Sequence, residues 1–229
     1  RSKFTQEKRP VLINNWEATY FDFTGEKLIE IARAAKPIGV DLFVMDDGWF
    51  GNRYDDNRAL GDWTVNEEKL GMTLAELVES IHQLGLDFGI WMEPEMVNED
   101  SDLYRAHPDW VLQFPHRKAL LGRNQFVLNL ARKEVVEYLY EKICQILDAA
   151  PISYLKWDMN RPLSDWYSKD LPADRQGELQ TRYILGLYDI LGRLTERYPD
   201  VLFEGCSSGG ARFDLGMLAF HPQIWTSDN

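Results

Sequence analysis

The stretch Tyr154-Leu155-Lys156-Trp157-Asp158-Met159-Asn160-Arg161 decides how the fold is read, because its short apolar run ends abruptly in charged and amide side chains. Such a run predicts a buried strand that presents polar groups at its carboxyl end. Asp158 is the first candidate for a reactive carboxylate. An aspartate just past a strand is also a common helix cap or turn residue, so the interpretation depends on the rest of the chain.

The same pattern recurs on both sides of this stretch. Apolar segments that end in polar residues alternate with amphipathic helical segments. The predicted strands cover residues 11–16, 41–48, 87–95, 154–161, 201–206 and 224–229, and the predicted helices cover 24–38, 73–84, 131–147, 176–198 and 212–220. Residues 96–130 interrupt the alternation as an insert, with a possible strand at 126–130. Strands joined by helices of crossover length indicate a parallel sheet and the α/β class.

Two α/β folds place polar groups at the carboxyl ends of their strands. An open doubly wound sheet is expected to have a glycine-rich first turn for a phosphate, but the first turn here is Asn14-Asn15-Trp16-Glu17. We therefore predict a (β/α)8 TIM-type barrel, which builds its site from the loops at that end. Six of the eight βα units are recognised, as a single catalytic domain over residues 1–229 that stops after the sixth strand.

The composition of the chain limits the kinds of partner and the compartment that can be expected. The formal net charge of -12 disfavours nucleic acid and anionic membranes, which require a basic surface. No apolar run approaches the roughly 20 residues of a membrane helix, and the start, Arg1-Ser2-Lys3-Phe4, is not that of a signal peptide, so a cytoplasmic protein is expected. Cys144 and Cys206 are too few for a disulfide framework. The 8 Trp and 10 Tyr suit cores and also the apolar faces of sugar rings.

The polar strand ends predict a cup of acids, amides and indoles. Retaining cleavage of a glycosidic bond needs two carboxyl groups roughly 5 Å apart, one as nucleophile and one as acid/base. Asp158 lies near Lys156 and Arg161, whose charges favour an ionised nucleophile. Asp228 follows the apolar pair Ile224-Trp225, a setting that favours the raised pKa of a general acid, although it is also suited to cap a helix.

Asp46 and Asp47 are interpreted as acceptors for two substrate hydroxyls, with a turn and helix cap as the alternative. Both can face the cup only if the strand has ended, which Gly48 favours. None of the four histidines lies at a predicted strand end, so no zinc site is expected. An oxygen-only Mg²⁺ or Ca²⁺ site made by Asp46, Asp47 and Glu93 is the metal alternative. Residues 206–210 are read as a tight glycine turn that approaches a ligand.

Six motifs in chain order resemble glycoside hydrolase family 36, the bacterial and fungal α-galactosidases: NWEA at 15–18, MDDGWF at 45–50, GIWMEPE at 89–95, KWDMNR at 156–161, EGCSSGG at 204–210 and WTSDN at 225–229. The resemblance implies a retaining α-galactosidase, without metal or organic cofactor, that removes terminal α-linked galactose from raffinose-type oligosaccharides. It implies Asp158 as nucleophile and Asp228 as acid/base. The substrate contacts that it implies are Trp16, Asp46, Asp47, Trp91, Arg123, Lys156, Asn160, Cys206 and Gly209.

The resemblance also implies a longer protein. Family members carry an N-terminal β-sandwich, two further barrel strands and a C-terminal β-domain, and many bacterial members are homotetramers. Two other functions stay open at this point. A galactosyltransferase would use the same two carboxylates with a sugar hydroxyl in place of water, and a non-catalytic sugar-binding module would keep the cup without turnover.

Overall fold

The computed structural model describes residues 3–228, with the exception of the Thr5 side chain. Its main sheet has six strands, whose spatial order β1-β2-β3-β6-β7-β8 follows the chain. Every neighbouring pair in this sheet is parallel. The strands are β1 (Leu12–Asn14), β2 (Leu42–Met45), β3 (Asp87–Met92), β6 (Tyr154–Trp157), β7 (Leu202–Gly205) and β8 (Gln223–Ile224). The predicted α/β class and TIM-type strand order are confirmed, as part of a barrel.

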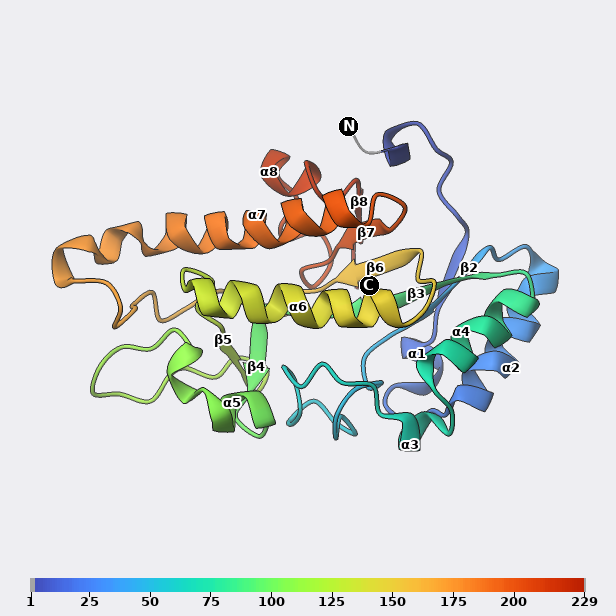
Figure 1. Cartoon of the computed structure of the whole chain (residues 1–229), viewed down its shortest axis with the longest axis horizontal. Coiled ribbons are helices and arrows are strands. Elements are labelled where there is room, and N and C mark those ends of the chain that lie inside the picture. The colour runs from blue at the N-terminus through green and yellow to red at the C-terminus, as the bar shows by residue number, and fades with distance from the viewer. Residues whose placement is uncertain (1–2, 229) are drawn as a thin grey trace.

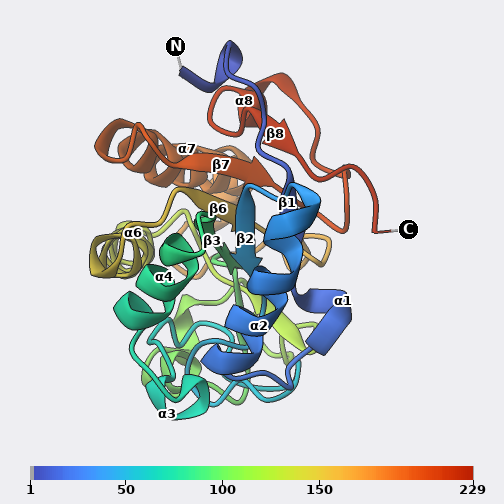
Figure 2. The same ribbon diagram turned by 90° about the vertical axis from the view of Figure 1, so that its right-hand side faces the viewer.

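Helices connect successive strands of the sheet, and α6 and α7 lie side by side along it (Figures 1 and 2). The connecting helices are α2 (Gly25–Ala35), α4 (Leu74–Gln83), α6 (Lys133–Ala149), α7 (Leu179–Arg197) and α8 (Leu215–Leu218). The shorter helices are η1 (Lys3–Thr5), α1 (Trp16–Thr19), η2 (Lys36–Ile38), α3 (Glu67–Leu70) and η4 (Ala173–Glu178). Within residues 3–228, no helix combines the length and apolar character needed to cross a membrane.

Local sequence signals set the helix ends. The Thr24 side chain accepts a hydrogen bond from the Lys27 amide at the start of α2. Thr73 and Glu76 form a reciprocal capping box at the start of α4. Gly85 follows α4 with a φ of 81°, a conformation that favours glycine. The predicted helices are therefore confirmed, although the last is only four residues long, Leu215–Leu218, where residues 212–220 were expected.

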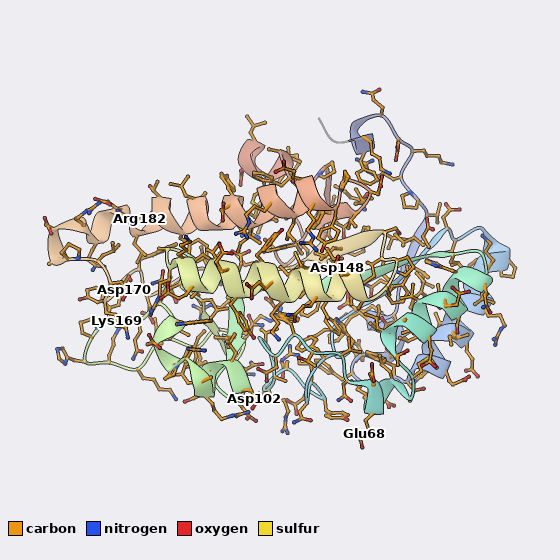
Figure 3. The ribbon with its side chains drawn as sticks, viewed as in Figure 1. Glu68, Asp102, Asp148, Lys169, Asp170 and Arg182 are labelled. Atoms are coloured by element: carbon orange, nitrogen blue, oxygen red, sulfur yellow. The ribbon has the colours of Figure 1, made fainter. Side chains whose placement is uncertain are left out.

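Alternating side chains of the strands pack on opposite faces of the sheet. Phe43 and Met45 of β2 join the large core between the sheet and the helices. Leu42 and Val44 of the same strand belong to a smaller cluster with Tyr154 on the other face. In contrast to these buried groups, labelled acidic side chains such as Glu68 and Asp148 lie on the outside of the molecule (Figure 3).

The connection between β3 and β6 contains the predicted insert. Here β4 (Met96–Asn98) pairs antiparallel with β5 (Gln125–Val127), and α5 (Asp102–Ala106) and η3 (Pro108–Trp110) lie between them. The strand expected at 126–130 is thus β5, shifted toward the N-terminus. The sixth strand of the sheet, β8, has two residues where 224–229 were expected, and Asn229 lies outside the described residues. After β8 the chain leaves the ladder, and the Thr226 carbonyl accepts a hydrogen bond from the Gly210 amide.

Candidate active site

A pocket of about 660 Å³ opens at the carboxyl ends of the strands. It brings together nine of the eleven site residues that the sequence suggested: Trp16, Asp46, Asp47, Trp91, Arg123, Lys156, Asp158, Asn160 and Asp228. The remaining lining residues are Leu12, Ile13, Asn14, Glu17, Phe21, Arg53, Asp56, Glu93, Gln125, Trp225 and Ser227. Parallel strands direct their carboxyl ends to one edge, which explains how residues more than 200 positions apart, such as Trp16 and Asp228, meet here.

Asp158 directly follows β6 and is buried. Its Oδ2 accepts hydrogen bonds from Trp91 Nε1 at 2.9 Å and from Asn160 Nδ2 at 2.6 Å. Its Oδ1 accepts the Met159 amide at 2.9 Å. These donors fix the orientation of the carboxylate at the floor of the pocket.

Asp46 and Lys156 form an ion pair across β2 and β6, with 3.2 Å between Lys156 Nζ and Asp46 Oδ2. Asn14 of β1 also donates to this oxygen. Burial disfavours the ammonium charge, but the Asp46 and Asp158 carboxylates outweigh burial and raise the pKa of Lys156 above its usual range. The pocket therefore holds a fixed cation beside its acids.

Asp47 is held by a buried arginine from the loop that follows β2. Arg53 Nε and Nη2 donate to the two carboxylate oxygens at 2.9 and 2.8 Å. Burial raises the pKa of Asp47, and the guanidinium opposes that rise. Because β2 ends at Met45 and Gly48 has a φ of 110°, Asp46 and Asp47 both line the pocket.

Glu93, just after β3, is a buried acid of the pocket wall. Its Oε1 accepts the Asn160 amide at 2.6 Å, and its Oε2 accepts Gln125 Nε2 at 3.0 Å. Burial, followed by the charge of Asp158, raises the pKa of Glu93 to about 8. Glu95, at the end of the strand predicted over residues 87–95, instead makes hydrogen bonds with Trp157, Tyr183 and Arg212.

Asp228 lies on the segment after β8, lines the pocket, and is exposed where the sequence suggested an apolar setting. Its Oδ1 accepts a hydrogen bond from Trp225 Nε1 at 3.1 Å. Lys156 Nζ lies 5.2 Å from the centre of the Trp225 ring, so this indole borders both Asp228 and the Asp46 ion pair. No helix cap is formed by Asp228 in the described part of the chain.

Cys206 and Gly209 do not line this pocket. They line a separate small hollow together with Arg212 and His221. Burial, and next the charge of Asp158, raise the pKa of the Cys206 thiol. Gly209 has a φ of 86°, and a Cβ there would lie 2.9 Å from Ser227 Cα. The glycine turn thus approaches the segment that carries Asp228.

Trp16 and Arg123 lie at the pocket rim. Trp16 is half-buried and packs edge-on against Tyr20 and Phe21, with ring centres 5.2 and 5.0 Å apart. Arg123 is exposed in the turn before β5. Sequence reasoning missed Arg53 and Gln125, because neither lies directly at the carboxyl end of a strand of the main sheet. Across residues 3–228, no three His, Cys, Asp or Glu side chains are arranged to hold a metal ion.

The sheet and its acidic pocket define a (β/α)-barrel protein with its site at the carboxyl ends of the strands. Over residues 1–229 the chain matches the family model described as Melibiase, and it belongs to this family. It is 56% identical to the α-galactosidase Mel36A of Lactobacillus acidophilus and to the bifunctional α-galactosidase/sucrose kinase AgaSK of Mediterraneibacter gnavus, with all of the chain covered. The chain spans about a third or less of these relatives, 31% and 24% of their lengths respectively.

The fold agrees with that of solved relatives. The crystal structure of the family 36 α-galactosidase AgaA from Geobacillus stearothermophilus superposes with a TM-score of 0.98 at 54% identity. All of this chain and 32% of that chain are covered. The resemblance to glycoside hydrolase family 36 seen in the sequence is therefore confirmed.

Proposed function

We propose that the protein carrying this chain is an α-galactosidase that removes terminal α-linked galactose from raffinose-type oligosaccharides. The observation that carries the proposal is one pocket lined by Asp158 and Asp228 together with the Asp46–Lys156 ion pair. Two carboxyl groups that flank a site rich in hydroxyl-binding groups are the requirement for glycoside cleavage.

In the proposed retaining mechanism, a carboxylate oxygen of Asp158 forms a bond to the anomeric carbon as the glycosidic bond breaks. Asp228 gives its proton to the departing oxygen and then takes a proton from the water that cleaves the galactosyl ester. The proposed galactose contacts are Asp46, Asp47, Trp91, Arg123, Lys156, Asn160, Cys206 and Gly209, with Trp16 near the outer sugar.

The relatives support the substrate class. Variants of Geobacillus AgaA have been solved in complex with raffinose and with stachyose. The relatives over the full chain at 53–56% identity are named α-galactosidases, one of them with a second sucrose kinase activity. These names favour hydrolysis over the transferase and the non-catalytic module.

The test is hydrolysis of raffinose and of an aryl α-galactoside by the full-length protein, with the first-formed galactose anomer followed by NMR. We expect α-galactose. A first product of β configuration would overturn the retaining assignment, and no release from either substrate would overturn the function. Galactosyl transfer that dominates even at low acceptor concentration would identify a transferase.

The expected assembly and location are also part of the proposal. We infer that the full-length protein is a cytoplasmic homotetramer that needs no metal or organic cofactor. Light scattering of the purified protein, cell fractionation and an assay after treatment with a chelator test these three statements. A monomer, a secreted protein or an activity lost on chelation would each contradict one of them.

A further inference from the structure

Asn98, the last residue of β4, has a completely buried side chain whose hydrogen-bonding capacity is filled. Its Oδ1 accepts Arg53 Nη1 and the Leu60 amide, both at 2.9 Å. Its Nδ2 donates to the carbonyl oxygens of Asp56 and Asn124 at 3.2 and 2.8 Å. An amide offers two donor hydrogens and two acceptor positions, so these partners also fix which way the amide points.

Through Arg53, Asn98 is connected by hydrogen bonds to Asp47, which lines the pocket. The guanidinium of Arg53, which donates to Asn98, makes the two-pronged contact with Asp47 through its other nitrogens. Both side chains of this ion pair are buried, at 2% and 9% exposure. Arg53 Nη1 also donates to the Arg58 carbonyl at 2.9 Å, so the guanidinium cannot turn without breaking several buried hydrogen bonds.

Through the Asn124 carbonyl, Asn98 is also connected to the turn that carries Arg123 at the pocket rim. Arg123 and Asn124 form the turn before β5, and reciprocal backbone hydrogen bonds of 3.1 and 2.9 Å between Gly122 and Gln125 close it. Arg123 and Asn124 have φ values of 50° and 60°, which are unfavourable for residues with a Cβ. Such a turn persists where its surroundings hold it, and the bond from Asn98 to the Asn124 carbonyl is one such restraint.

We propose that Asn98 is a positioning residue that sets the spacing between Asp47 and Arg123 across the pocket and thereby the affinity for the sugar. Asn98 does not line the pocket. It acts through Arg53 on one side and through Asn124 on the other. The inference rests on the proposed function, because it assumes that Asp47 and Arg123 contact the bound sugar.

The test is the Asn98→Asp variant of the full-length protein. Aspartate has nearly the same shape, but it turns an oxygen toward the two carbonyl groups and offers Arg53 a carboxylate that competes with Asp47. We expect the Kd for galactose, measured by calorimetry, and the KM for an aryl α-galactoside to rise about tenfold or more, with kcat changed much less. In an Asp47→Asn background, the same change should weaken galactose binding by a smaller factor than in wild type, because only the route through Asn124 and Arg123 remains.

Asn129→Asp is the matched control. Asn129 is equally buried beyond β5, donates to Ser168 Oγ at 3.0 Å and lies outside the pocket. The Asn129→Asp variant should have a lower midpoint of thermal unfolding than wild type, but its Kd for galactose should stay within about twofold of the wild-type value. If wild type binds galactose and the Kd of Asn98→Asp stays within that range, the inference is wrong. If wild type itself neither binds galactose nor cleaves the aryl galactoside, the proposed function fails instead.

A second variant keeps the inference testable if Asn98→Asp does not fold. Arg53→Lys preserves the positive charge but cannot bridge Asp47 and Asn98 at once. We expect the same rise in KM and Kd, again with a smaller change in kcat. Unchanged affinity in a folded Arg53→Lys protein would overturn the inference.

Discussion

The indole Nε1 of Trp91 donates a 2.9 Å hydrogen bond to Oδ2 of Asp158, from the neighbouring strand of the sheet. The Trp91 ring is itself held in an aromatic cluster, with ring centres of Phe50 and Trp63 each 6.4 Å away. The Trp91 carbonyl accepts the Trp49 indole at 2.9 Å. The carboxylate is thus oriented by a side chain that packing already holds rigid.

Trp91→Phe should lower kcat/KM of the full-length protein by about 10- to 100-fold, because a hydrogen bond to a charged carboxylate is lost while an aromatic ring remains. Trp63→Phe is the control in the same cluster. The Trp63 Nε1 is buried and has no hydrogen-bond partner within the described residues. Its replacement should change kcat/KM by less than about threefold. Equal losses for the two variants would mean that packing, and not the hydrogen bond, matters.

The sequence predicted the parallel sheet and most of the pocket because both follow from local patterns. Asp46 and Asp158 each end an apolar run, and the carboxyl ends of parallel strands converge. Arg53 and Asn98 could not be predicted in this way. They lie 45 positions apart, in a loop and in a hairpin, and only tertiary packing brings their side chains together. The sixth strand was predicted, but its early end at Ile224 was not, since the pairing of Thr226 with Gly210 leaves no local signal.

Asp158→Ala should abolish turnover, and azide should partly restore it by attacking the vacated face to give a galactosyl azide of inverted configuration. Stopped assays followed by NMR of the product measure both effects. Asp189→Ala, at an exposed position on α7, is the control and should keep wild-type rates. Turnover of Asp158→Ala without azide would rule out the proposed nucleophile.

Asp228→Ala should slow the glycosylation of substrates with poor leaving groups far more than that of activated aryl galactosides, because an easily departing oxygen needs little protonation. The loss for raffinose is expected to reach about 100-fold or more. Parallel kcat/KM measurements on raffinose and on a nitrophenyl galactoside test this. Similar losses on both substrates would argue against an acid role.

Because of Glu93, the free energy of unfolding should decrease as the pH rises. Its pKa in the folded protein is about 8, against an ordinary value of 4.5. Between these pH values the folded state keeps a proton that the unfolded state releases, so unfolding becomes more favourable as the pH increases. Glu93→Gln cannot ionise, and its stability relative to wild type should therefore improve by about 1 kcal/mol or more from pH 5 to pH 8.

Denaturant unfolding at the two pH values measures the difference between Glu93→Gln and wild type. Glu141→Gln, on the exposed side of α6, is the control and should follow wild type at both. A constant difference between Glu93→Gln and wild type would show that Glu93 is ionised throughout this range.

Glu95→Gln should destabilise the protein by about 3–5 kcal/mol, because it breaks the ion pair between the fully buried Glu95 and Arg212, whose side chain is only 15% exposed. Glu178→Gln, which removes a solvent-accessible partner of Arg175 and Arg182, should cost much less. Unfolding midpoints of the two variants provide the comparison. A loss of similar size at both positions would contradict the distinction between buried and surface ion pairs.

The inserted hairpin of β4 and β5 has a consequence for protein engineering. Asp46 and Asp158 directly follow strands of the main sheet, whereas Arg123 and Gln125 belong to the hairpin segment. Exchanging this segment between homologues would therefore vary the proposed sugar contact Arg123 while leaving the proposed contacts Asp46, Trp91 and Lys156 in place. The segment to exchange is discontinuous in sequence. Residues 96–127 must be exchanged together with the loop that carries Arg53, because Asn98 and the Arg53 guanidinium are joined by a buried hydrogen bond.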